Sequence, residues 1–314
     1  MDIAVIGAGR TVNGIGPYIA GYFQRHGMPV TAVLGRSAES TARAAAGLGR
    51  FGIKARAYTS FTEMIEKARP DAVAIAAPTA THADSIERCL ASGVHIFCDK
   101  PFVAPDTPDL TAWLVSVLRR AHARGLTVAM NSQWPFVLPW YAELCGKVAP
   151  ARARTFAMRL SPGVSGPAMI PDSLPHALSL LYDALGNGEI TGLTFKREGD
   201  AHIVAFSYAT DQTRCAATIT LVQELRQPRT LAFGFDGRIA TRVIDPATYA
   251  MSLTCRGKTL DIPDPLELSV KDFIDSLAGK HTPRIGADHI ARTTMLLQQI
   301  HDAAIRLAGK LWKD

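Results

Sequence analysis

Short apolar runs alternate with amphipathic stretches over the first 130 residues. Buried strands are predicted where Val, Ile and Ala cluster, at 2–6, 30–34, 72–76, 94–98 and 126–130. Helices are predicted in the Ala-rich stretches between them, which carry polar residues along one side, at 15–26, 37–48, 60–68, 81–92 and 107–124. Strands that alternate with helices are typical of βαβ units, so this part predicts a doubly wound parallel sheet of the Rossmann type.

The pattern changes after Pro135. One helical stretch near 172–186 precedes short strand-like runs at 203–208, 216–222, 230–235 and 251–255, which predict a mostly antiparallel sheet. Two closing helices, near 266–279 and 286–308, are expected to pack on that sheet or to return to the first domain. The expected fold class is α/β, with a Rossmann domain over 1–130 and a C-terminal α+β domain with a mostly antiparallel sheet over 131–314.

The composition is that of a globular protein of more than one domain. A chain of 314 residues exceeds what one hydrophobic core usually serves, and 47% of its residues are hydrophobic against 20% charged. The net charge of +6 comes from lysines and arginines dispersed among acids, without the basic run typical of nucleic-acid binding. We therefore expect no nucleic-acid partner, only a mild attraction for anionic ligands.

Five widely spaced cysteines form no C-x-x-C pair, and no histidine set stands near them at metal-ligand spacing. This favours reduced thiols and no metal. The first residues lead directly into a strand-like run without the features of a signal peptide, and no apolar run reaches the ~20 residues that span a bilayer. We expect a cytoplasmic protein without a membrane partner.

A glycine-rich run, GAGRTVNGIG at 7–16, follows the first strand directly. Glycines there let backbone amides approach a pyrophosphate, and the next helix offers its positive N-terminal end. The run departs from G-x-G-x-x-G because Val12 stands at the third glycine's place, with Gly14 and Gly16 following in a longer loop. The alternative is a tight turn that binds no ligand. The residues expected to contact a dinucleotide here are Gly7, Gly9, Arg10, Thr11 and Gly14.

At the end of the second strand stand Gly35, Arg36 and Ser37. Folds specific for NAD usually hold an acidic residue at this place, which accepts hydrogen bonds from the ribose diol. A guanidinium instead binds a 2′-phosphate, and a serine hydroxyl can join it. We predict that Arg36 and Ser37 bind NADP(H), with NAD(H) as the alternative if Arg36 is only a solvated surface residue.

Two further segments lie at carboxyl ends of parallel strands, where open α/β sheets bind ligands: APTATH at 77–82 and CDKPF at 98–102. With the glycine run, Pro-Thr-x-x-His and Asp-Lys-Pro resemble the glucose-fructose oxidoreductase/inositol dehydrogenase (Gfo/Idh/MocA) family over most of the chain. That family usually has Glu-Lys-Pro, so Asp99 departs from its pattern. The resemblance implies that Lys100 lies beside the nicotinamide and the substrate hydroxyl. We expect these segments to contribute to the cofactor site through Ala77, Pro78, Thr79, His82, Asp99 and Lys100.

An ammonium group near the reacting oxygen stabilises the developing alkoxide, which is the physical reason why a lysine suits position 100.

Downstream, Asp172 and His176 match the family's Asp-x-x-x-His pair, which implies that His176 exchanges a proton with the substrate while Asp172 orients its ring. Lys100, Asp172 and His176 are then expected to meet in a cleft between the two domains. Alternatively Asp172 or Ser173 caps a helix, since Pro175 is tolerated only in a first turn.

Gln133 and Trp134 stand where the family often carries an arginine–phenylalanine pair. They are candidates to border the nicotinamide, and packing at the domain junction is the alternative for the tryptophan. His82 is a candidate to hydrogen-bond near the cofactor, with helix capping or surface placement as alternatives.

The leading hypothesis is an NADP-dependent oxidoreductase that moves a hydride between the nicotinamide and a small hydroxyl, carbonyl or imine substrate, such as a sugar or polyol. Two alternatives stay open: a redox-neutral enzyme with tightly bound cofactor, and a non-catalytic regulator that senses dinucleotide. A broad sheet with one covered face commonly binds a partner, so a homodimer or homotetramer is expected.

Overall fold

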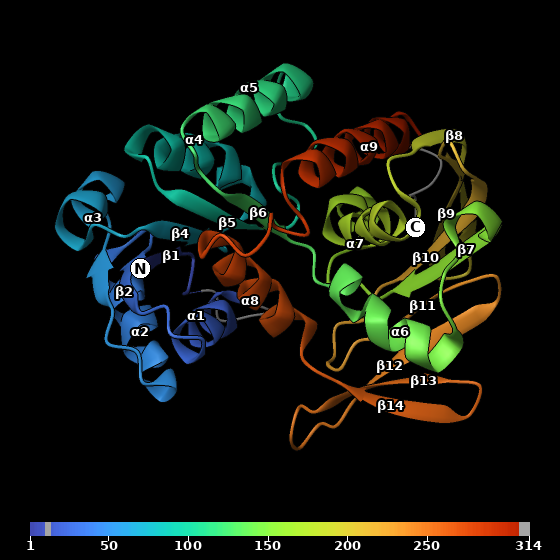
Figure 1. The fold of residues 1–314 in the computed structure, drawn as a ribbon, viewed down its shortest axis with the longest axis horizontal. Helices are drawn as coiled ribbons and strands as arrows, with labels where there is room; N and C mark the ends of the chain where they lie inside the picture. The colour runs from blue at the N-terminus through green and yellow to red at the C-terminus, as the bar shows by residue number, and fades with distance from the viewer. Residues whose placement is uncertain (10–13, 308–314) are drawn as a thin grey trace. The chain divides into compact units, whose positions relative to one another are not determined.

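The computed structural model describes residues 1–9 and 14–307, and Figure 1 shows their fold. The chain divides into two compact units. Unit 1 comprises residues 1–131 and 266–291, and unit 2 comprises residues 132–265 together with the chain from 292 onward. The range 131–314 is therefore not one continuous unit, because residues 266–291 return to the first.

Unit 1 contains a six-stranded parallel sheet in the order β3-β2-β1-β4-β5-β6. Its strands are β1 (Ile3–Ile6), β2 (Val30–Leu34), β3 (Arg56–Tyr58), β4 (Ala72–Ile75), β5 (His95–Asp99) and β6 (Val128–Asn131). Its helices are α1 (Gly16–Arg25), α2 (Ala38–Gly47), α3 (Phe61–Ala68), α4 (His82–Ser92), α5 (Leu110–Ala123) and α8 (Pro265–Leu277), with short 3₁₀ turns η1 (Leu48–Phe51) and η2 (Thr79–Thr81). The predicted Rossmann-type parallel sheet is confirmed. The pattern missed β3, whose three residues include only one buried position.

Helix α8 joins unit 1 through an aromatic cluster. Phe273 lies 6.1 Å from Phe23 of α1 and 5.4 Å from Phe97 of β5 between ring centroids. All three rings are fully buried. Aromatic contacts of this kind add to the large apolar area that the rings bury, which explains why α8, far beyond β6 in the sequence, returns to this core.

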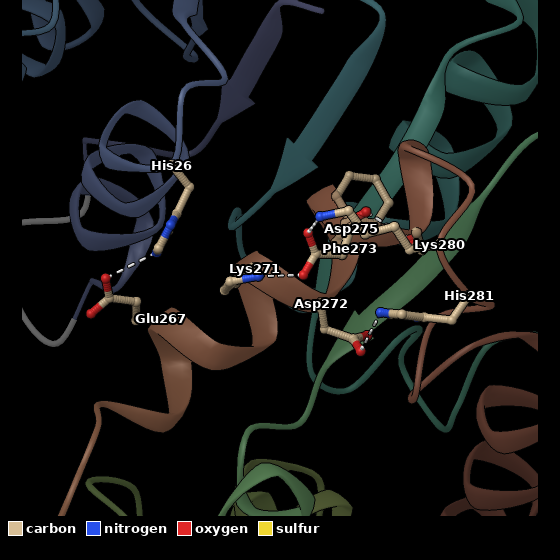
Figure 2. A network of polar contacts seen from close by, with 9 residues as sticks. His26, Glu267, Lys271, Asp272, Phe273, Asp275, Lys280 and His281 are labelled. Carbon is tan, nitrogen blue, oxygen red and sulfur yellow. Dashed lines mark hydrogen bonds and ion pairs between the residues drawn. The ribbon is translucent and has the colours of Figure 1, made fainter.

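Polar contacts join α8 to the end of α1 and to the residues that follow the helix (Figure 2). Glu267 lies 3.0 Å from Nε2 of His26, at the end of α1. It also accepts hydrogen bonds from Arg25. Further along the helix, the Asp275 carboxylate is paired with Lys271 and, at 2.8 Å, with Lys280. These hydrogen bonds lower the pKa of Asp275 to about 2.

Replacing Asp275 by asparagine is expected to destabilise the protein by about 1 kcal/mol near neutral pH, since the pairs are partly exposed to solvent. The folded-state pKa lies below the unfolded one, so this stabilisation is present above about pH 4 and is lost as the pH falls toward about 2. Urea unfolding at several pH values measures it. The Lys196→Gln control removes an exposed pair with Glu198 and should change little. A D275N deficit that stays constant down to the acid range would contradict the assignment.

Unit 2 contains an eight-stranded sheet in the order β14-β13-β12-β11-β7-β10-β9-β8. All neighbours pair antiparallel except β7 and β10, which are parallel. The strands are β7 (Thr155–Leu160), β8 (Glu189–Glu198), β9 (Ala201–Ala209), β10 (Arg214–Val222), β11 (Leu231–Phe235), β12 (Arg238–Ile244), β13 (Met251–Cys255) and β14 (Lys258–Ile262). The remaining elements are α6 (Leu138–Cys145), α7 (Met169–Leu185), α9 (Ala287–Arg306, which crosses from unit 1 into unit 2) and the 3₁₀ turns η3 (Trp134–Val137), η4 (Pro150–Arg152) and η5 (Gly166–Ala168). The predicted mostly antiparallel sheet is confirmed.

The core of unit 2 lies on one face of this sheet. Alternate residues of β10, such as Ile219 and Leu221, are buried together with Leu174, Leu178 and Leu181 of α7. On the opposite face, the intervening positions of β7 are exposed and those of β10 are exposed or half-buried. This period of two is what a sheet with one covered face requires.

Helix α7 begins at Met169, three residues earlier than the pattern predicts, and Pro175 lies inside it. The expectation that Pro175 stands in a first turn is therefore wrong. The carbonyl of Pro175 accepts a hydrogen bond of 3.2 Å from the buried hydroxyl of Ser132, so a neighbouring segment stabilises the helix at the proline. Asp172 instead lies in the first turn, where a carboxylate interacts favourably with the helix dipole.

Candidate active site

The glycine-rich loop brings the end of β1 against the end of β4. Gly7 has φ +91°, and a Cβ there would lie 2.6 Å from Cα of Ala77. A Cβ on Gly16 would lie 3.0 Å from Cα of Ala8. Any side chain at either position would displace backbone, so both glycines are required by the turn. Gly9 is less constrained, with Cβ of Ala44 as its nearest contact at 3.4 Å.

This loop fits a dinucleotide pyrophosphate. It lies at the carboxyl edge of a parallel sheet and leads into α1, whose first turn has no side-chain hydrogen-bonded cap among the described residues. Uncapped amides at a helix start bind anionic groups. Gly14 lies two residues before α1, half-buried, whereas Arg10 and Thr11 lie outside the described residues.

Arg36 and Ser37 follow β2 after Gly35, and β2 is the strand next to β1, from which the glycine loop leads. Both side chains are exposed. The Ser37 hydroxyl accepts a hydrogen bond of 3.3 Å from the backbone N–H of Ser40 and thereby caps α2. Ser37 thus stabilises the start of α2. Arg36 places an exposed guanidinium close to the end of β2.

His82 begins α4, after Ala77, Pro78 and the turn that contains Thr79. Its side chain is only 1% exposed, so the surface alternative is wrong. Nε2 lies 2.9 Å from the carbonyl oxygen of Ala77, and Nδ1 lies 2.9 Å from that of Pro101. The histidine therefore connects the loop after β4 with the loop after β5.

Asp99 and Lys100 stand at the end of β5, before a cis bond between Lys100 and Pro101. The Asp99 carboxylate accepts hydrogen bonds from the backbone N–H of Lys100 and, at 3.1 Å, from Nδ2 of Asn131 at the end of β6. Burial raises the pKa of Asp99, against the lowering effect of the Lys100 charge, the His82 ring and these hydrogen bonds. Asn131 holds the Asp99 carboxylate in place, and the sequence pattern did not identify it as a site residue. Its position at the end of β6, the strand next to β5, could have indicated this contact.

Asp172 and His176 lie one turn apart on α7, and both are partly buried. A spacing of four places them on one face of the helix. They belong to unit 2, whereas Lys100 belongs to unit 1. The structure thus brings Asp172 and His176 together and, separately, Lys100, Asp99 and His82.

Gln133 immediately precedes η3 and is half-buried. Trp134 is 1% exposed and lies in the core of unit 2, 6.3 Å from Phe233 between ring centroids and beneath the guanidinium of Arg242 at 5.6 Å. This buried environment is the one expected if Trp134 is a packing residue.

Within residues 1–9 and 14–307, no group of three or more His, Cys, Asp or Glu side chains is arranged to hold a metal ion. No helix in the same part of the chain combines the length and apolar character needed to cross a membrane. Neither finding assigns a function.

Residues 1–131 match the model of the Gfo/Idh/MocA family, described as an oxidoreductase family with an NAD-binding Rossmann fold. No curated protein sequence matches the chain.

Among solved structures, UDP-N-acetylglucosamine 3-dehydrogenase from Acidithiobacillus ferrooxidans is similar at 22% identity and TM-score 0.71, over 96% of this chain and 97% of that one. An oxidoreductase from Agrobacterium radiobacter, in complex with NAD+, L-tartaric acid and magnesium, is similar at 14% identity and TM-score 0.71, over 97% of this chain and 96% of that one. A probable dehydrogenase from Thermotoga maritima reaches TM-score 0.73 at 14% identity, over 98% and 97% of the two chains. The first 131 residues are therefore similar to the NAD-binding domain of the Gfo/Idh/MocA oxidoreductases, and the whole chain shares its fold with these solved structures.

Proposed function

We propose that this protein is an NADP-dependent oxidoreductase that interconverts a hydroxyl and a carbonyl, or an amine and an imine, on a small substrate of the sugar or polyol type. The observation that carries the proposal is the carboxyl edge of the unit 1 sheet. There the glycine loop after β1 packs against Ala77, which follows β4, and Lys100 follows β5, the next strand of the sheet beyond β4. An anion-binding turn and a lysine thus share the edge at which open parallel sheets bind ligands.

Each candidate residue has a distinct chemical task in this proposal. Gly7, Gly9, Gly14 and the start of α1 would hold the pyrophosphate, and the bound nicotinamide supplies hydride transfer. The Lys100 ammonium stabilises negative charge on the substrate oxygen, because opposite charges interact strongly where water is excluded. His176 takes the hydroxyl proton or returns it, while Asp172 orients the imidazole.

The experiment is a panel of substrates followed by NADPH absorbance. It should include sugars, polyols and simple carbonyl compounds, and also UDP-N-acetylglucosamine and L-tartrate, which are named with two of the similar structures. Turnover that consumes or forms one NADPH per product supports the proposal. Product formed without net change in NADPH would establish the redox-neutral alternative. Complete inactivity with dinucleotide bound would favour a regulator.

Arg36→Ala is expected to raise the Kd for NADPH roughly tenfold to a hundredfold and to leave the Kd for NADH unchanged, because a hydrogen bond to a charged group contributes about 1.5–3 kcal/mol. Tryptophan-to-nicotinamide energy transfer or calorimetry measures both constants. Arg43→Ala, on the exposed side of α2, is the matched control and should change neither. If R36A left NADPH binding intact, the cofactor would be assigned as NAD(H).

We also propose that two copies of the chain associate through the open face of the unit 2 sheet. Across its centre, Thr218 of β10 is paired with Ala157 of β7 on one side and Ala205 of β9 on the other. These small uncharged side chains are at least partly exposed. Small side chains allow a second sheet to pack closely, since stacked sheets lie about 10 Å apart.

Sedimentation is expected to show a dimer or tetramer of the 33.8 kDa chain, and Thr218→Arg is expected to yield monomers because it buries an unpaired charge at the interface. Thr62→Arg, at an exposed position of α3, is the control and should leave the assembly unchanged. A parent protein that sediments only as 33.8 kDa particles at working concentration would contradict the association.

We propose that the protein acts in the cytoplasm, and the reduced state of its cysteines is consistent with that location. All five are free thiols. Burial raises the pKa of Cys98 well above its ordinary value and that of Cys215 to about 11, so both stay protonated and unreactive at neutral pH.

A further inference from the structure

Two arginines of unit 2, Arg229 and Arg242, lie next to each other. Arg229 stands two residues before β11, and Arg242 belongs to β12. Nη2 of Arg242 donates a hydrogen bond to the backbone carbonyl of Arg229, and the charges of the two side chains repel each other. The guanidinium of Arg242 lies 5.6 Å from the centre of the Trp134 ring, whose face attracts cations. Two cations held side by side in this way attract negatively charged ligands.

The Arg229 guanidinium has hydrogen-bond donors that the protein does not use. Nε and Nη2 are buried and have no hydrogen-bond partner in the part of the chain that the structure describes. The group packs against Gly163, where a Cβ would lie 2.8 Å from Cζ of Arg229. Nearly all buried N–H groups in folded proteins are paired, so these donors indicate an acceptor that the protein itself does not provide. Carboxylate and phosphate oxygens are the acceptors that match a guanidinium.

The nearby carboxylates do not balance the charge of this pair. The Glu224 carboxylate lies 3.6 Å from Nη2 of Arg159 and also attracts Arg242. Asp264 is the other carboxylate that attracts Arg242. Three arginines thus share two carboxylates, so one positive charge is in excess. Because Arg229 is partly exposed, this charge can act on a ligand in solution.

Arg229 lies beside the segment that leads into α7. Gly163, against which its guanidinium packs, belongs to residues 161–168 between β7 and α7. Helix α7 carries Asp172 in its first turn and His176 one turn further on. The unpaired donors therefore lie next to the connection to the helix that provides the proposed acid–base group.

Arg242 is connected to the same helix through Trp134. Trp134 begins η3, and two residues before it the Ser132 hydroxyl donates to the carbonyl of Pro175, directly before His176. Two separate contacts therefore place the arginine pair in the part of unit 2 that holds His176. An anion at the arginines and a hydroxyl at the imidazole can then belong to one small molecule.

We propose that Arg229 binds an anionic group of the substrate, a carboxylate or a phosphate, and that Arg242 positions Arg229 through the hydrogen bond to its backbone carbonyl. The substrate is then an acidic sugar or polyol derivative and not a neutral one. This inference rests on the proposed function, because it adds a second anchoring point for the substrate to the site of His176. Binding at a group that does not react holds the reacting hydroxyl in place.

Spectra of the arginine Nε–H groups test anion binding without catalysis. Inorganic phosphate and malonate are titrated separately into the full chain, and Arg229→Gln and Arg226→Gln assign the two ¹H–¹⁵N signals that are compared. We expect the Arg229 signal to shift and saturate with at least one anion, because Nε–H gains an acceptor. The signal of Arg226, an exposed residue three positions earlier, should stay in place. No saturable shift at Arg229 with either anion would overturn the inference.

Matched substrates test the role of the anionic group in specificity. D-glucose, D-glucuronate and D-glucose 6-phosphate share one ring and differ at C6, and corresponding sets built on other sugars extend the panel. We expect an acidic compound that turns over to have a kcat/KM about 10–100-fold above that of its neutral counterpart, mainly through a lower KM. Neutral sugars that turn over as well as their acidic counterparts would refute the inference.

Variants of Arg229 show whether this side chain causes the preference. Arg229→Gln is expected to raise KM for the acidic compound roughly ten- to a hundredfold with kcat within about threefold, and Arg229→Lys should retain part of the preference. Arg226→Gln, which removes an exposed arginine of the same loop, is the matched control and should change neither constant. Equal losses in R226Q and R229Q, or a loss in kcat alone, would contradict a binding role for Arg229.

The two proposals fail separately. An enzyme that prefers neutral sugars of the panel overturns the inference and leaves the proposed function intact. A protein whose Arg229 signal saturates with phosphate or malonate, but which turns over no compound of the panel, overturns the proposed function while the anion site stands.

Discussion

Replacing Lys100 by methionine is expected to lower kcat roughly 10²–10³-fold, the usual effect of removing one group that stabilises a developing oxyanion. Methionine keeps the length and apolar stem of the side chain but removes the ammonium. The side chain is partly buried at the end of β5, where its charge also interacts with Asp99. A charge acting at the substrate oxygen changes the chemical step more than binding, so the Kd for NADPH should change little.

Lys100→Arg is the informative companion to this variant. It preserves the positive charge but spreads it over a planar guanidinium, so partial activity is expected. Stopped-flow and steady-state rates with the best substrate of the panel measure both. If K100M retained kcat within a factor of about two, the lysine would be a surface residue and the proposed site would be wrong.

The second large effect is expected at His176. His176→Gln should lower kcat roughly 10²–10⁴-fold, the range for loss of a general acid–base, and should remove the pH dependence that the imidazole contributes to kcat. Asp172→Asn should have a smaller effect of the same kind, because it leaves the imidazole in place and removes only the group that orients it.

His301→Gln is the matched control for this experiment. His301 lies on α9 in unit 2, with 14% of its side chain exposed and Nδ1 3.8 Å from Asp302. Its replacement should leave the pH–rate profile unchanged. A profile that is identical in the parent, H176Q and H301Q would show that another group transfers the proton.

The fold was predictable where local pattern and burial agree. Strands β1 and β4 are buried at every position, as central parallel strands are, and their continuous apolar runs mark them clearly. Strand β8 carries charged residues on a largely exposed surface and contains a register shift near Gly192, so it offers neither a period of two nor an apolar run. Strands β7, β12 and β14, which were also missed, each place charged or polar residues on an open face.

Parts of the candidate site depend on contacts between distant residues, which no local pattern contains. The glycine run identifies its own turn, because the φ of +91° at Gly7 is a local requirement. The sequence alone does not show that His82 meets Pro101, or that Asn131 donates to Asp99, because separate strands bring these residues together. Likewise, the return of α8 to unit 1 depends on Phe273 packing against rings far away in sequence.

A crystal structure of the protein with NADPH and an unreactive substrate analogue tests the central claim most directly. We predict that Nζ of Lys100 and a ring nitrogen of His176 both lie within about 3.5 Å of the analogue's reacting oxygen, next to C4 of the nicotinamide, with the pyrophosphate on Gly7 and Gly9. A complex in which the dinucleotide binds elsewhere, or in which the ammonium and the imidazole face different ligands, would contradict the account.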